Sequence, residues 1–164
     1  MQSEGKLGKT TRKGFTLVEL IVVIAIIGVL AAIIVPTTIH FVNEAKIEAA
    51  KSDCSSILNT INTYMPQIAA DSDGHSMVDA SVVGAILTES FGGSPQEGTQ
   101  VSITLGTNGN GVNTFTIKVT SPIQENGSAI SSSRTYTETN ILKASEGTVT
   151  LTNGTWVASE ATAG

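Results

Sequence analysis

An uninterrupted apolar stretch near the start of the chain constrains the fold more than any other feature. Residues 15–35 read FTLVELIVVIAIIGVLAAIIV, in which Glu19 is the one charged residue. A helix of this length spans about 31 Å, which matches a hydrocarbon core of about 30 Å. Residues 1–14 carry four basic side chains and one acidic side chain. Because Lys and Arg stay on the cytoplasmic side, we expect the rest of the chain to lie outside the cytoplasm.

The apolar stretch favours a retained membrane anchor over a secretory signal. An ordinary secretory signal has an apolar region of roughly 7–15 residues, followed by a small-residue cleavage site. Here the run is longer, and Ala31–Ala32 lie inside it with no polar stretch after them. Cleavage after the run is the alternative.

Composition excludes several other classes of protein. The chain has 164 residues, of which 14% are charged, and this length allows one globular domain with an appended segment. The formal net charge of −5 argues against a nucleic-acid partner. Cys54 is the only cysteine, which excludes an intramolecular disulfide and a cysteine-only metal site. We find no nucleophile with a base and no cluster of metal-ligating residues, so we expect no catalytic site, no metal and no cofactor.

Glu19 is the unusual residue of the apolar stretch. A carboxylate near the centre of a bilayer costs about 2.5–3.5 kcal/mol, and it costs less near a helix start, where the helix dipole favours negative charge. One interpretation is that the carboxylate reaches the membrane interface. The other is that Glu19 pairs with a positive group that arrives only when helices pack together.

The residues around Glu19 carry a family resemblance. Residues 13–19 read KGFTLVE, and the apolar run and Pro36 follow. A basic residue, a glycine, a phenylalanine and a glutamate four places later, at the head of a membrane-length run, resemble the leader junction of type IV prepilins and related pseudopilins. The resemblance covers residues 12–45 and is absent after about residue 65. The single cysteine departs from the many Gram-negative pilins that close a C-terminal loop with a disulfide, and it favours disulfide-free members.

This resemblance implies a processing reaction at the start of the helix. A membrane aspartyl prepilin peptidase would cut between Gly14 and Phe15 on the cytoplasmic face and would then N-methylate Phe15. Glycine before the cut lets the chain approach an enzyme closely. The cut leaves the anchor on the mature protein and creates an ammonium group at Phe15, which is the missing positive partner for Glu19. This amine and Glu19 lie four residues apart in one helix, so they could pair internally. Pairing between neighbouring subunits would instead fix their axial register, and on this hypothesis we assign Phe15 and Glu19 to assembly.

Two residues are expected to soften the helix. Pro36 predicts a kink or a free carbonyl near Ala32, and Gly28 adds a second weak point. One interpretation is a tolerated kink, which membrane helices accept. The other is a segment that bends or melts as subunits leave the bilayer and pack.

The chain stays helical beyond Pro36 but becomes amphipathic. We expect the helix to end near Thr63, before Met65–Pro66. Its predicted apolar side recurs at steps of three and four residues, or multiples of them, through Val42, Ala45, Ala49, Ile57, Ile61 and Ile68.

A loop and a short helix are predicted next. Residues 71–75 read DSDGH and predict a solvated turn. Residues 76–90 predict a helix, with Ser76 and Asp79 as candidate N-terminal caps and Gly92–Gly93 as its end.

From Gln100 the apolar period changes to two, which indicates strands over 101–105 and 115–119, joined by a loop at 108–111. Residues 134–142 predict a weaker third strand. Residues 148–152 and 155–158 flank Asn153–Gly154, the favoured pair for a two-residue type I′ hairpin, which sets Leu151 opposite Trp156.

The predicted fold class is therefore α+β. A long N-terminal helix, transmembrane in its first half and amphipathic in its second, packs on a C-terminal antiparallel sheet of four or five strands. We divide the chain into a cytoplasmic leader that is removed (residues 1–14), a transmembrane and filament-core helix (15–35), and a globular head that includes the amphipathic half of the helix (36–164).

The resemblance implies a structural subunit of a type IV pilus, or fimbrium, and not an enzyme. The precursor would cross the cytoplasmic membrane once, then be cleaved, methylated and assembled helically into an extracellular filament for adhesion, twitching motility or related surface functions. The implied partners are further copies of the chain, the prepilin peptidase, a pilus assembly platform and the cytoplasmic membrane. No nucleic acid is expected for the isolated subunit.

Two alternatives stay open. A pseudopilin of a type II secretion or DNA-uptake pseudopilus would have the same first 45 residues. A single-pass anchored binding domain that never assembles would show neither cleavage at Gly14–Phe15 nor any effect of Glu19.

Overall fold

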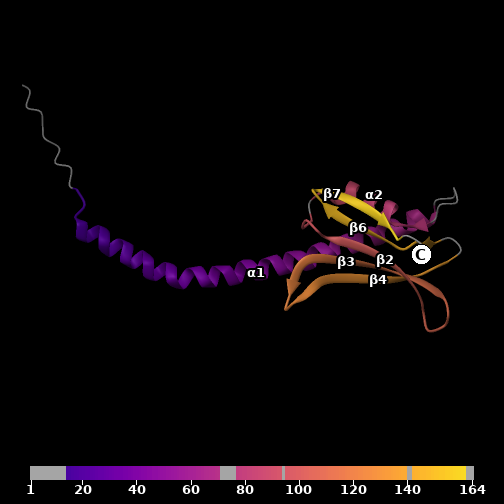
Figure 1. Cartoon of the computed structure of the whole chain (residues 1–164), viewed down its shortest axis with the longest axis horizontal. Helices are drawn as coiled ribbons and strands as arrows, with labels where there is room; N and C mark the ends of the chain where they lie inside the picture. Colours follow the sequence, from indigo (N-terminus) through magenta and orange to yellow (C-terminus); the bar gives the residue numbers. More distant parts are fainter. Residues whose placement is uncertain (1–13, 71–76, 94, 140–141, 162–164) are drawn as a thin grey trace, which may run out of the picture. The chain divides into compact units, whose positions relative to one another are not determined.

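The computed structural model describes residues 14–70, 77–93, 95–139 and 142–161 (Figure 1). The elements in chain order are helix α1 (Leu17–Ala70), strand β1 (Met77–Val78), helix α2 (Ala80–Phe91), and strands β2 (Gln100–Thr107), β3 (Asn113–Glu125), β4 (Ser128–Thr137), β5 (Lys143–Ala144), β6 (Gly147–Thr152) and β7 (Thr155–Glu160). The chain divides into two compact units, Met1–Val42 and Asn43–Gly164, and we call the second unit the head.

The described part of the first unit is the beginning of α1. Every residue from 14 to 42 is exposed, including large apolar side chains such as Ile24 and Ile33. Among the described residues, α1 is the one helix long and apolar enough to cross a membrane. Because exposed apolar surface is unfavourable in water, this surface suits contact with lipid or with other apolar helices.

Helix α1 continues without interruption through Gly28, Pro36 and Pro66 and ends at Ala70. The predicted end near Thr63 was therefore wrong. Proline inside a helix costs about 3 kcal/mol, but Met65 is buried beside Pro66 and Ile68 packs against the core. Burial of these side chains offsets the cost of the proline.

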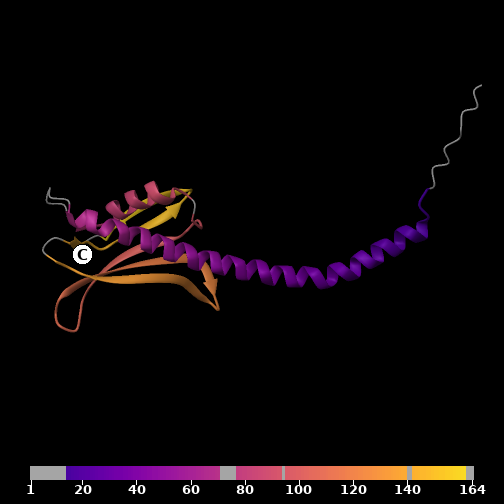
Figure 2. The ribbon, with the colours of Figure 1, turned by 180° about the vertical axis from the view of Figure 1, so that it is seen from behind.

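The head is built on a five-stranded antiparallel sheet with strand order β4-β3-β2-β6-β7. A separate two-stranded parallel sheet joins β1 to β5. Within the head, α2 and the part of α1 from Asn43 onward lie on one side of the large sheet (Figure 2). The predicted α+β class and the antiparallel sheet are confirmed.

The core lies between the two helices and one face of the sheet. Strand residues alternate between buried and more exposed positions, as a sheet with one covered face requires. The buried side chains of α1 form a stripe at steps of one to four residues: Ala50, Cys54, Ile57, Leu58, Ile61 and Met65. The sheet contributes Val101, Ile103, Phe115, Ile117, Val119, Val149, Leu151 and Trp156.

The predicted apolar side of α1 was correct only in part. Ile57 and Ile61 are fully buried, whereas Val42, Ala45 and Ala49 are exposed. The buried stripe begins at Ala50, so apolar spacing in the turns before it does not mark the core of the head.

The hairpin between β6 and β7 forms as predicted. Asn153 and Gly154 have φ values of 51° and 71°, both positive as a type I′ turn requires. Leu151 lies opposite Trp156 in the register. Gly147 at the start of β6 permits a close approach of α2, since a Cβ atom at Gly147 would lie only 2.8 Å from the Cβ of Ala80.

Two predicted elements are displaced. The strand predicted at 134–142 is β4, which begins at Ser128 because Asn126 and Gly127 turn the chain with positive φ values of 52° and 80°. The helix predicted from residue 76 begins at Ala80 because Met77–Val78 pairs with β5 instead. Asp79 is its N-cap, and Oδ1 of Asp79 accepts a hydrogen bond from Val82 N. Ser76, the loop at 71–75 and residues 1–13 of the leader lie outside the described residues.

Candidate functional site: the start of helix α1

Helix α1 begins with a reciprocal hydrogen-bonded cap between Thr16 and Glu19. The Glu19 carboxylate oxygen Oε2 accepts bonds from Thr16 N at 2.8 Å and from Thr16 Oγ1 at 2.9 Å. Thr16 Oγ1 in turn accepts a bond from Glu19 N at 3.2 Å. This is the capping box, in which a threonine before the helix and a glutamate three residues later each satisfy a backbone donor of the other.

The predicted cleavage residues directly precede this cap. The side chain of Phe15 is 92% exposed, and Gly14 has no atom within 4 Å of the position that a Cβ would occupy. The Gly14–Phe15 bond is therefore open to an enzyme. The structure places Phe15, Thr16 and Glu19 together at the positive end of the helix dipole, where a carboxylate is favoured.

The helix surface that follows is apolar on all sides. Its exposed side chains include Leu20, Ile27 and Ile34. The hydroxyl groups of Thr37 and Thr38 donate hydrogen bonds to the carbonyl oxygens four residues earlier, those of Ile33 and Ile34, at 2.6 and 2.8 Å. The two hydroxyl groups that follow Pro36 are thus satisfied within the helix, and the surface suits contact with lipid or with other apolar helices.

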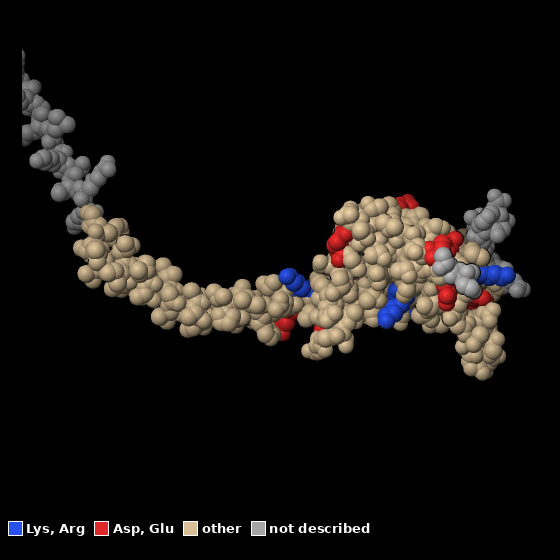
Figure 3. Space-filling view, in the orientation of Figure 1, with Lys and Arg blue, Asp and Glu red and all other residues tan. Residues whose placement is uncertain are grey.

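The outward face of the head's sheet is dominated by hydroxyl groups. The positions that alternate with the buried ones carry, among others, Thr104 on β2, Thr116 on β3 and Thr135 on β4. Oγ1 of Thr116 and Oγ1 of Thr135 lie 2.8 Å apart across the strands. Few charged side chains lie over these strands (Figure 3). The face is therefore polar but nearly uncharged.

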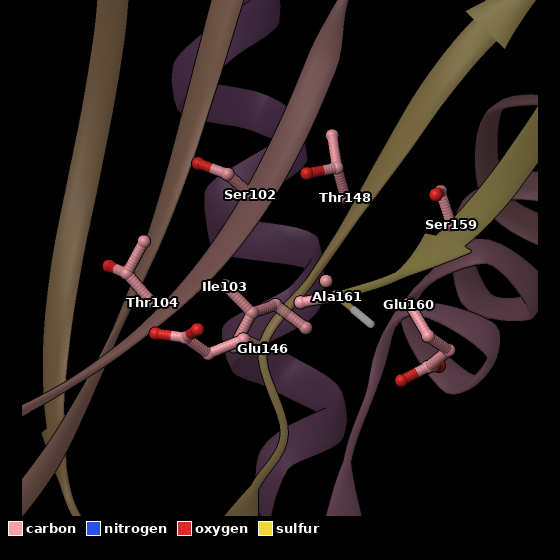
Figure 4. Close-up of a pocket in the computed structure, with 9 residues that line it drawn as sticks. Ser102, Ile103, Thr104, Glu146, Thr148, Ser159, Glu160 and Ala161 are labelled. Carbon is pink, nitrogen blue, oxygen red and sulfur yellow. The ribbon is translucent and has the colours of Figure 1, made fainter. Parts of the chain in front are cut away.

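A hollow of about 280 Å³ opens beside β2, β6 and β7 (Figure 4). Hydroxyl groups of Ser102, Thr148 and Ser159 line it together with the carboxylates of Glu146 and Glu160. Oε1 of Glu146 accepts a bond from Leu105 N at 3.2 Å, and Oε2 of Glu160 accepts one from Ser145 Oγ at 3.3 Å. Each of the two carboxylates therefore already accepts a hydrogen bond from the head itself. Among residues 14–70, 77–93, 95–139 and 142–161, no group of three or more His, Cys, Asp or Glu is placed to hold a metal ion.

Lys51 and Cys54 of α1 each make a polar contact with the β3–β4 hairpin. Lys51 Nζ lies 2.8 Å from Oε1 of Glu125, and this hydrogen bond raises the pKa of Lys51 above its ordinary value. Cys54 is buried, with Sγ 3.8 Å from the carbonyl oxygen of Ile130. Burial raises the pKa of the Cys54 thiol, so this cysteine is a packed core residue and not a reactive one.

Two hydrogen-bonded arrangements, one at Thr16 and Glu19 and one at Glu97, were not predicted from the sequence. The T-x-x-E spacing of Thr16 and Glu19 is a known signature of a helix cap. Because the same residues belong to the leader-junction motif, we interpreted them only as part of that motif. Glu97 lies in the loop before β2, and its two carboxylate oxygens accept bonds from Asn153 N and Gly154 N. No sequence signal links Glu97 to that distant turn.

The start of α1 matches a known class of N-terminal segment. A family model described as the prokaryotic N-terminal methylation motif matches residues 9–35. The type II secretion system core protein G of Pseudomonas aeruginosa is 40% identical over 53 residues, which cover 32% of this chain and 37% of that protein. The type IV major fimbrial protein FimA of Dichelobacter nodosus is 38% identical over 57 residues, which cover 35% of this chain and 36% of that protein.

A third relative extends the same pattern. The type IV major pilin protein PilA of Myxococcus xanthus is 38% identical over 55 residues, 34% of this chain and 25% of that protein. The resemblance to type IV prepilins and pseudopilins is confirmed for the N-terminal segment. The matched segment spans little more than a third of the length of the first relatives. No solved structure matches the chain.

Proposed function

We propose that this chain is a structural subunit of a type IV pilus. The observation that carries the proposal is the exposed apolar first part of α1, up to Val35, headed by Gly14, Phe15 and a capped Glu19. A helix of this kind is stable in a bilayer before assembly and among identical helices after it. The proposal assigns no catalytic role to the chain.

The proposed precursor crosses the cytoplasmic membrane once through residues 15–35. A prepilin peptidase removes residues 1–14 by cutting the exposed Gly14–Phe15 bond and then N-methylates Phe15. Cleavage ahead of the helix keeps the anchor and places a new positive charge four residues before Glu19. Residues 36–164, which include the head, lie on the outer side of the membrane.

Assembly transfers the apolar helix from lipid to a bundle of neighbouring helices, through a pilus assembly platform. Packing of residues 15–35 against neighbours keeps the large apolar side chains out of water, at about 25 cal/mol per Å² of apolar surface. Pairing of Glu19 with the Phe15 amine of a neighbouring copy sets the axial register. Gly28 and Pro36 are the proposed points at which the helix bends as it leaves the bilayer.

The head supplies the outer surface of the proposed filament. Its hydroxyl-bearing sheet face adds polarity without a strong charge, which suits an extracellular surface that makes contact with solids or cells. Adhesion and twitching motility are the surface functions that we assign to the filament.

A second candidate is a pseudopilin that assembles a short pseudopilus in a type II secretion or DNA-uptake system. The similarity to a type II secretion system core protein G favours it, because that protein matches the same N-terminal segment. Deletion of the gene separates the two candidates. Loss of surface fibres in electron micrographs, restored by the wild-type chain, supports the pilin. Normal fibres with loss of secretion or DNA uptake would support the pseudopilin.

The role of Glu19 is tested in cells that also express untagged wild-type chain. We expect tagged Glu19→Ala subunits to be cleaved but to enter sheared filaments far less than tagged wild-type subunits. Equal incorporation would contradict the pairing between Glu19 and the neighbouring amine.

A further inference from the structure

The Glu19 carboxylate already has a partner inside its own helix. Thr16 donates two hydrogen bonds to Glu19 Oε2, from its backbone nitrogen and from its hydroxyl group, and Thr16 Oγ1 accepts the Glu19 backbone N–H. The carboxylate is therefore bound before any second subunit is present.

This cap fixes where the negative charge lies. Side chains in a helix point toward its N-terminus, and the bonds to Thr16 hold the Glu19 carboxylate over the first turn. That position keeps the charge beside the helix start, away from the apolar residues Leu20 to Val35. It also turns the carboxylate toward the residue that becomes the N-terminus after cleavage.

Cleavage between Gly14 and Phe15 leaves this arrangement intact. The nitrogen of Thr16 is an amide before and after the cut, because Phe15 remains attached to it. The groups that make the three bonds therefore survive the cut, and Thr16 still offers the Glu19 carboxylate a partner in the lipid phase.

We propose that Thr16 is a positioning residue that holds Glu19 at the helix start until the Phe15 amine of a neighbouring subunit takes over the carboxylate. Assembly then exchanges one bound state of Glu19 for another. This inference rests on the proposed function as a filament subunit. It adds a role for the Thr16 hydroxyl, which the pairing of Glu19 with an amine does not require.

Solid-state NMR of the full mature chain tests the exchange directly. In lipid bilayers we expect a correlation between the Glu19 carboxylate carbon and the Thr16 side chain. In assembled filaments we expect this correlation to be replaced by one between the Glu19 carboxylate and the Phe15 N-methyl group. A Glu19–Thr16 correlation that persists unchanged in the filament, or that is absent in the bilayer, would overturn the proposal.

Variants test whether the hydroxyl matters for assembly. Thr16→Val removes the hydroxyl at nearly constant shape, and Thr16→Ser retains it. Thr37→Val is the matched control, since the Thr37 hydroxyl bonds only to the Ile33 carbonyl in the same helix. Each tagged variant is expressed with untagged wild-type chain, and its share of sheared filaments is divided by its share of mature subunits in the membrane.

We expect Thr16→Val to lower this ratio severalfold, because without the hydroxyl the Glu19 carboxylate is no longer held at the helix start where the neighbouring amine meets it. Thr16→Ser and Thr37→Val should match the wild-type chain. A wild-type ratio for Thr16→Val, or an equal loss for Thr37→Val, would overturn the role of Thr16. If the wild-type chain is cleaved but forms no filament at all, the proposed function itself fails, and this result is distinct from a failure of Thr16 alone.

Discussion

Glu97 is the surface side chain whose replacement we expect to destabilise the head most. Its carboxylate accepts hydrogen bonds from both backbone nitrogens of the β6–β7 turn, from Asn153 N to Oε1 and from Gly154 N to Oε2, the second at 3.2 Å. The same loop also joins β6 through its backbone, because Gly98 N donates to Leu151 O and Leu151 N donates to Thr99 O, both at 2.9 Å. Glu97 therefore ties the loop before β2 to the turn between β6 and β7.

The magnitude follows from the number of bonds lost. A hydrogen bond to a charged group contributes about 1.5–3 kcal/mol, and the exposure of Glu97 argues for the lower end for each bond. Glu97→Gln keeps one acceptor oxygen and should cost about 1.5 kcal/mol on that scale. Glu97→Ala loses both bonds and should cost about 3 kcal/mol by the same reasoning.

Trp156 provides the assay. It is the only tryptophan of the chain, is 6% exposed and lies opposite Leu151 next to the turn. Urea unfolding of the full chain in detergent micelles, followed by Trp156 fluorescence, gives the free energy of unfolding of the head. Glu89→Gln, on the exposed surface of α2, is the matched control and should stay within about 0.5 kcal/mol of the wild-type chain. A Glu97→Gln value as small as that of the control would refute the reasoning.

Three further predictions concern the core. Ile61→Ala should lower the free energy of unfolding of the head by about 2–5 kcal/mol in urea. Ile39→Ala, at a position 57% exposed, should leave that free energy unchanged. Equal effects of the two substitutions would contradict the assignment of Ile61 to the core. Burial holds the pKa of the Cys54 thiol above its ordinary 9.0, so the folded head retains this proton longer than the unfolded chain. Stability should therefore be steady below pH 9 and fall above it, and Cys54→Ala should flatten the fall measured by urea unfolding. Trp156→Phe should cost less than about 1.5 kcal/mol by circular dichroism, because within the described part of the chain the buried Trp156 Nε1 makes no hydrogen bond that the substitution would remove.

Local signals predicted the parts of the fold that local chemistry determines. The apolar run, the alternation in β2 and β3, and the Asn153–Gly154 turn each depend on residues close together in the sequence, and each forms as expected. The pair of Leu151 and Trp156 followed from the turn alone, since a two-residue turn fixes the register of its strands.

The parts that failed depend on partners far along the chain. Helix α1 continues past Pro66 because Met65 and Ile68 pack against the core of the head. Helix propensity does not include such tertiary contacts, so the sequence alone did not predict this extension. The start of β4 at Ser128 was hidden because this strand is mostly serine and threonine, with Ile130 as its buried residue. The start of α2 was shifted because Met77–Val78 pairs with β5, more than sixty residues later.

The residues of the candidate site could also be predicted from the sequence, because they are close together in it. Gly14, Phe15 and Glu19 lie within six consecutive residues, so their proximity needs no tertiary fold. What the motif did not reveal is that Glu19 is already bound by Thr16, which is a matter of side-chain geometry at the helix start.

Intact mass and N-terminal sequencing of the protein from membranes and from sheared surface material test whether the chain is cleaved, methylated and assembled into a filament. We expect an N-methylated phenylalanine at Phe15 in both fractions, with the sheared material rich in this mature form. A mature terminus confined to membranes would support the pseudopilin. An uncut Met1 terminus, in cells with an active prepilin peptidase, would contradict the account and leave a simple anchored domain.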